Sequence, residues 1–64
     1  MSTGIVKFFN AKKGFGFIID DETKEDIFVH SSGLNGEIQE NDHVSYEIQE
    51  DTRGKKAIGV AVVD

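Results

Sequence analysis

KGFGFI, residues 13–18, places two aromatic rings on one face of a short strand. Side chains alternate between the two faces of a β-strand, so Phe15 and Phe17 share one face while Gly16 and Ile18 share the other. Large apolar rings are usually buried, and periodicity alone favours the core for both phenylalanines. Rings on the outer face would instead need a flat apolar ligand to cover them.

Four other segments resemble this one in composition, and turn signals separate all five. Each is rich in valine, isoleucine or aromatic residues, and none shows a helical period. Besides residues 15–20, the predicted strands are 4–10, 26–30, 43–49 and 56–63, with a short helical turn near 31–34. Five strands in so short a chain cannot form two packed sheets, so we expect an all-β fold: a small five-stranded antiparallel β-barrel of the OB type.

The predicted third strand favours an outer position for the aromatic residues. Phe28 shares a face with the polar residues Asp26 and His30. Lys13 lies two positions before Phe15 and would point to the same side as the two rings of the second strand. An aliphatic set large enough to fill a small barrel then remains for the inside, with Tyr46 also expected in the core: Val6, Ile18, Ile27, Val29, Val44, Ile48 and Val60. From the residues alone, the inward and outward orientations stay about equally favoured.

Composition narrows the classes of function. The chain has 64 residues and no cysteine, so we expect one domain over residues 1–64, without disulfides. Two histidines make a poor structural zinc site, no catalytic dyad or triad stands out, and neither an enzyme nor a cofactor is expected. The acidic cluster at 20–25 could attract a cation, but a solvated turn is the simpler interpretation. No apolar run approaches the length of a membrane span, and a cytoplasmic protein is expected.

Charge is unevenly distributed along the chain. The net charge of −5 divides into +3 over residues 1–19, −10 over residues 20–51 and +2 over residues 52–64. If the two basic ends meet in space, they form one positive surface on an acidic body.

KGFGFI and IFVH, residues 27–30, resemble the two RNA-binding motifs of the bacterial cold shock domain family. GIVKFFN at 4–10 resembles the first strand of that family, G-x-V-K-W-F-N, and the similarity continues in the same order through nearly the whole chain. The resemblance implies an OB-type barrel that binds single-stranded RNA and DNA, with little duplex binding, as a monomer and an RNA chaperone. A protein partner docked on the same aromatic face is the alternative.

The resemblance also assigns the contact residues. Aromatic residues and His30 would meet bases, cations would meet phosphates, and Asp26 would accept hydrogen bonds from bases. The implied set is Lys7, Phe8, Phe9, Asn10, Lys13, Phe15, Phe17, Asp26, Phe28, His30, Arg53 and Lys56. The family places Val6 inside and Phe8 outside, which strict alternation forbids, so a bulge or a strong curl is expected in the first strand.

Three departures from the family pattern lie on this surface. Phe8 replaces the usual tryptophan, Ser31 stands where many members have phenylalanine, and the connection between the third and fourth strands is shorter and lacks an aromatic residue. We therefore expect weaker binding or a shorter footprint than in a fully aromatic member.

Overall fold

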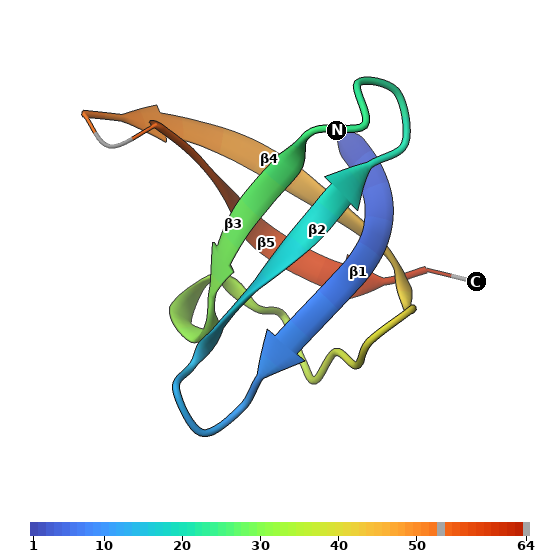
Figure 1. Ribbon diagram of the computed structural model, residues 1–64, viewed down its shortest axis with the longest axis vertical. Coiled ribbons are helices and arrows are strands. Elements are labelled where there is room, and N and C mark those ends of the chain that lie inside the picture. Colours follow the sequence, from blue (N-terminus) through green and yellow to red (C-terminus); the bar gives the residue numbers. More distant parts are fainter. Residues whose placement is uncertain (53, 64) are drawn as a thin grey trace.

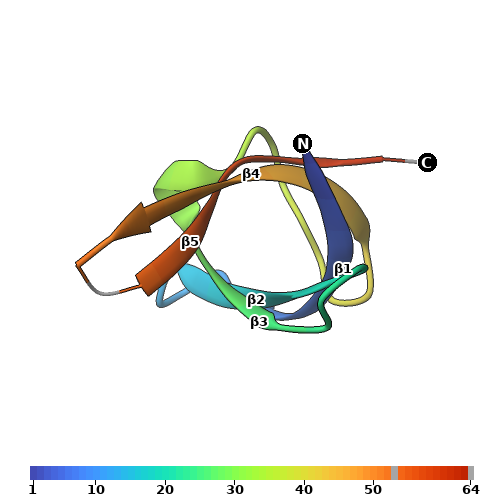
Figure 2. The same cartoon turned by 90° about the horizontal axis from the view of Figure 1, so that it is seen from above.

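Five strands and one short 3-10 helix make up the computed structural model, which describes residues 1–52 and 54–63. In chain order they are β1 (Ser2–Asn10), β2 (Phe15–Asp20), β3 (Asp26–His30), η1 (Ser31–Gly33), β4 (His43–Asp51) and β5 (Gly54–Val62). The strands close into a barrel in the order β1-β2-β3-β5-β4 (Figures 1 and 2). The expected barrel and helical turn are confirmed, and the strand ends differ from the prediction by one or two residues.

One strand pair departs from the expected antiparallel pattern. β3 and β5 run parallel, and they pair at Phe28 with Lys56 and at Val29 with Ala57. This pair closes the barrel and places a lysine from the end of the chain beside an aromatic residue of β3. No helix in residues 1–52 and 54–63 has the length and apolar character needed to cross a membrane.

The core confirms most of the predicted aliphatic set. The buried apolar residues are Val6, Ile18, Ile27, Val29, Ile38, Val44, Tyr46, Ala57 and Val60. Ile48 was expected among them and is 38% exposed, so that prediction was wrong. β1 pairs with β4 only from His43 to Tyr46, so Ile48 lies past the covered part of β4, on the hairpin that projects in Figure 1.

Ile38 fills part of the core from the connection between η1 and β4. Periodicity could not identify it, because this connection has no regular strand or helical pattern. Its burial shows that the short connection covers one end of the barrel.

Asp20 is the one buried charged residue among those described, at 5% exposed. The Tyr46 hydroxyl donates to its Oδ2 at 2.5 Å, and the backbone N–H groups of Glu22 and Thr23 donate to its Oδ1 at 2.8 and 3.0 Å. The Tyr46 hydrogen bond, followed by the two backbone bonds, lowers the pKa of the Asp20 carboxyl. Burial, together with the adjacent carboxylate, raises the pKa of the Tyr46 hydroxyl. Asp20 therefore closes the β2–β3 turn from inside, and its assignment to a solvated turn was wrong.

Tyr46→Phe should reduce the free energy of unfolding by about 1–2 kcal/mol, because a buried carboxylate loses a hydrogen-bond donor. Urea unfolding followed by far-UV circular dichroism measures this change. Thr3→Val is the matched control, since it removes an exposed hydrogen bond from Thr3 to Asp21 and should alter stability by less than about 0.5 kcal/mol. Equal effects of the two substitutions would contradict the role assigned to Asp20.

The parent and Tyr46→Phe should also differ in how their free energy of unfolding depends on pH. The native pKa of Asp20 lies below its ordinary value of 3.8, so its stabilisation is complete above that pH and is lost as pH falls through the lower native pKa. The stability gap between the parent and Tyr46→Phe should stay constant from about pH 7 to about pH 5 and narrow below about pH 4.

Candidate nucleic-acid interface

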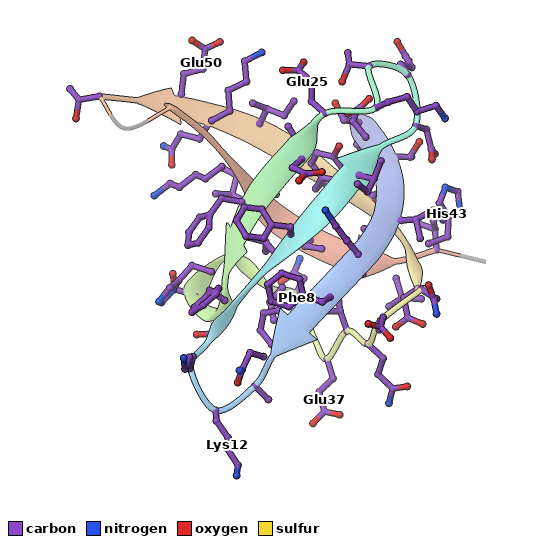
Figure 3. The ribbon with its side chains drawn as sticks, viewed as in Figure 1. Phe8, Lys12, Glu25, Glu37, His43 and Glu50 are labelled. Atoms are coloured by element: carbon purple, nitrogen blue, oxygen red, sulfur yellow. The ribbon has the colours of Figure 1, made fainter. Side chains whose placement is uncertain are left out.

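A bulge in β1 determines which of its side chains face outward. Val6 pairs with Ile18 and Phe8 pairs with Phe17, so the β1–β2 register shifts between Val6 and Phe8. The extra residue on β1 changes the alternation, which lets Val6 be fully buried while Phe8 lies half-exposed on the outside. The expected irregularity in the first strand is confirmed, and Figure 3 shows Phe8 in front of the sheet.

Four phenylalanine rings form a closed cluster on the outer face of β1, β2 and β3. Phe8 contacts Phe15 and Phe17, and Phe28 contacts the same two rings, with ring centroids 5.6–6.3 Å apart. All four are half-buried and none belongs to the core. We call these rings the aromatic cluster. The structure thus places the phenylalanines of KGFGFI outside the core.

Gly16 allows β1 to approach β2 closely beneath this cluster. A Cβ atom at Gly16 would lie 2.3 Å from the Phe8 carbonyl oxygen and 2.8 Å from Phe9 Cα. Both are backbone atoms that a side-chain rotation cannot move. Phe9 packs against the core instead of joining the aromatic cluster, although the resemblance lists it among the contacts.

Lysines border the aromatic cluster on both sides. Lys7 on β1 has its Nζ 3.3 Å from Asp26 Oδ2 on β3, and both side chains are about half-exposed. Lys56 on β5 is opposite Phe28, and Lys13 is exposed in the turn between β1 and β2. These three lysines therefore come from both basic ends of the sequence. Arg53, also implied by the resemblance, lies outside the described residues.

Asn10 shapes the turn that carries Lys13. Its side-chain Oδ1 accepts hydrogen bonds from the backbone N–H groups of Lys12 and Lys13, both at 3.0 Å. The Asn10 carbonyl also accepts from the Gly14 N–H at 2.7 Å, and Gly14 has a φ of 76°, which favours glycine. Both Asn10 oxygens thus stabilise the β1–β2 turn at the rim of the interface.

Asp26 and His30 lie on either side of Phe28 along β3, and both are exposed. His30 is directly opposite Phe15 on β2. Its Nδ1 accepts a hydrogen bond from the Ser32 backbone N–H at 3.1 Å. His30 thereby caps η1, and Ser32, to which sequence reasoning assigned no role, takes part through its backbone N–H, a group that carries no sequence signal.

Apart from Asp26, which borders the aromatic cluster, several acidic side chains lie away from it. In Figure 3, Glu25, Glu37 and Glu50 lie at the periphery of the molecule, each at some distance from Phe8. Asp21 accepts hydrogen bonds from His43 Nε2 at 2.9 Å and from the Thr3 hydroxyl at 2.8 Å, and these bonds, that of His43 first, lower the pKa of its carboxyl. Within residues 1–52 and 54–63, no three acidic or histidine side chains are placed to hold a metal ion.

Comparison with known proteins gives one consistent result. The model of the "'Cold-shock' DNA-binding domain" family matches residues 2–63. The Major cold shock protein of Micrococcus luteus is 45% identical, and the Cold shock-like protein CspD of Bacillus cereus is 47% identical; each match covers 94% of this chain and 96% of the relative. The solved structure of drosophila Unr CSD456 superimposes with a TM-score of 0.81 over 98% of this chain and 26% of that one. At 23% identity, that likeness concerns the fold.

Gly16→Ala should disrupt the aromatic cluster, because the new methyl group meets backbone atoms. It should lower the free energy of unfolding by about 1–3 kcal/mol or more. Thermal unfolding measures the stability, and the ring-current shifts of the phenylalanine NMR signals report the cluster. Ala11→Gly in the exposed β1–β2 turn is a control for loss or gain of a methyl group, and it should leave those shifts unchanged. A fully stable Gly16→Ala with native ring shifts would show that the close approach is not needed.

Proposed function

This chain belongs to the "'Cold-shock' DNA-binding domain" family, and from that premise we propose that it binds single-stranded RNA and DNA and acts as an RNA chaperone. The observation that carries the proposal is the aromatic cluster, four half-exposed rings bordered by Lys7, Lys13 and Lys56. Half-buried rings leave part of their apolar surface in water, and a ligand with flat apolar faces removes that cost.

Unpaired nucleobases are such ligands. Stacking of a base on an aromatic side chain contributes about 1–3 kcal/mol and depends little on sequence, because every base has a π face. In a duplex the bases are already stacked and paired, so these rings cannot reach their faces. The aromatic cluster therefore favours single strands over duplexes.

The lysines account for phosphate binding by an acidic protein. Lys7 and Lys56 lie on opposite sides of β2 and β3, and Lys13 lies at the end of the same face. A strand that crosses the aromatic cluster would thus meet a cation at each border. Lys7 already pairs with Asp26 across an exposed 3.3 Å contact, which is weak enough for a phosphate to replace.

The chaperone action follows from mass action. A protein that binds only the open strand shifts a hairpin toward its unpaired form without ATP. RNA kept open in this way changes the formation of terminator hairpins and the access of ribosomes, so transcription antitermination and translation are the processes affected. We place this action in the cytoplasm and assign it to the monomer.

Phe8, Ser31 and the short η1–β4 connection limit the affinity. A phenyl ring offers less stacking area than an indole, and exposed Ser31 offers none. The proposed footprint is accordingly short, and phosphate contacts supply a larger share of the binding.

Phe17→Ala and Phe28→Ala should each weaken binding to a single-stranded oligonucleotide by about 5- to 100-fold, the equivalent of one lost stacking contact. Fluorescence anisotropy with a labelled oligonucleotide measures this loss, and circular dichroism verifies that the barrel is intact. Ile48→Ala is the matched control, since Ile48 is a partly exposed apolar residue outside the aromatic cluster. If the parent binds no single strand, or binds duplex equally well, the proposal fails and a protein partner becomes the better explanation for this face.

Binding should also depend moderately on salt. Three or four phosphate contacts give a slope of log K against log[salt] of about −2 to −3 on single strands. Lys7→Gln should reduce the magnitude of that slope by about 0.7. Lys12→Gln, at the tip of the β1–β2 turn in Figure 3, should change it less. Tight binding that salt does not weaken would contradict this division between stacking and phosphate contacts.

A further inference from the structure

His30 has one ring nitrogen engaged by its own chain. The Ser32 backbone N–H donates to His30 Nδ1 at 3.1 Å, and the Ser32 hydroxyl oxygen lies 3.0 Å from the same nitrogen. A backbone N–H can donate but cannot accept. This hydrogen bond requires that Nδ1 be the unprotonated nitrogen of the ring.

This bond determines which atom the ring offers to a ligand. A neutral imidazole has one protonated nitrogen, so a ring with unprotonated Nδ1 has its proton on Nε2. His30 is exposed, follows Phe28 on the outer face of β3 and is directly opposite Phe15. Nε2 makes no hydrogen bond within residues 1–52 and 54–63, so its N–H is available to a ligand from a residue that adjoins the aromatic cluster.

We propose that His30 is a hydrogen-bond donor of fixed tautomer that selects bases bearing a carbonyl group at this position, with Ser32 as its positioning residue. The inference rests on the proposed function, since it assigns base selectivity to the same interface. A neutral ring with Nε2–H can donate to the C4 carbonyl of uracil or thymine or to the C6 carbonyl of guanine, the positions at which cytosine and adenine carry an amino group. It cannot accept a hydrogen bond from the exocyclic amino group of cytosine or adenine.

Phosphate oxygens also accept hydrogen bonds, and the position of His30 favours the base. The ring is opposite Phe15 and beside Phe28, both members of the aromatic cluster, while the described lysines of the interface lie at its borders. If His30 donated to a phosphate, its replacement would lower the affinity for every sequence equally. A donor to a base carbonyl would change the ratio between sequences.

NMR tests the tautomer directly. Long-range proton–nitrogen correlation of the imidazole rings at about pH 8, where histidine is neutral, should show His30 with its proton on Nε2. His43 supplies an internal reference, because its Nε2 lies 2.9 Å from the Asp21 carboxylate and must donate to it. Ser32→Ala keeps the backbone N–H and should leave the tautomer of His30 unchanged. A proton on Nδ1, or a mixture of the two tautomers in the parent, would overturn the inference.

Binding measurements test the selectivity with oligonucleotides whose bases differ in a single functional group. Uridine and cytidine oligomers form one pair, and inosine and adenosine oligomers form another; in each, a carbonyl replaces an amino group. His30→Asn retains an oxygen that can accept the Ser32 N–H but lacks the outer donor, whereas His30→Gln retains an outer amide N–H. The carbonyl-to-amino affinity ratio should fall about 2- to 10-fold in His30→Asn relative to the parent, and less in His30→Gln.

His30→Phe separates donation from stacking, because it keeps a ring and removes the donor. Its carbonyl-to-amino ratio should fall as in His30→Asn, even if its overall affinity is preserved. Single-strand binding with a ratio that none of these substitutions changes would overturn the inference while leaving the proposed function intact. Absence of single-strand binding by the parent would overturn both.

Discussion

The close approach of β1 to β2 at Gly16 is the constraint on which the rest of the structure depends. The backbone of Phe8 and Phe9 occupies the space that a side chain at Gly16 would need. This contact is adjacent to the bulge between Val6 and Phe8, and together they let β1 bend around the barrel while changing face. Val6 can then fill the core, and Phe8 can join Phe15 and Phe17 outside.

The barrel separates its charges in space as it separates its apolar residues. Strand order places Lys7 and Lys56 on either side of β2 and β3, although the two residues are 49 positions apart (56 − 7) in a chain whose middle is strongly acidic. Asp20 is buried, where Tyr46 and two backbone N–H groups satisfy it. The acidic side chains labelled in Figure 3 lie at the periphery. A protein of net negative charge thereby presents a surface suited to a polyanion.

Under the proposed function, the outer face would combine three kinds of contact that differ in how far they depend on the base sequence. Ring stacking is tolerant of sequence, lysine–phosphate contacts are independent of it, and a hydrogen bond from His30 would distinguish one base edge from another. The first two contribute most of the proposed affinity, so any selectivity from a single donor is modest. Such a balance would suit the proposed RNA chaperone, since strong selectivity would restrict the strands that it can hold open.

By itself, the sequence determined the five strands, the barrel and most of the core, because alternation and turn signals are local properties of the chain. It also identified the residues of the aromatic cluster through the resemblance of GIVKFFN, KGFGFI and IFVH to family motifs, although alternation left their orientation open. The tertiary structure decided what depends on distant neighbours: the exposure of Ile48 past the end of β1, the burial of Ile38 from an irregular connection, and the parallel pair that brings Lys56 to Phe28. It also decided the partner of Asp20 and the partner of His30 Nδ1. The burial of a side chain and the pairing of a polar atom depend on which segments meet in space, and local periodicity carries no information about that meeting.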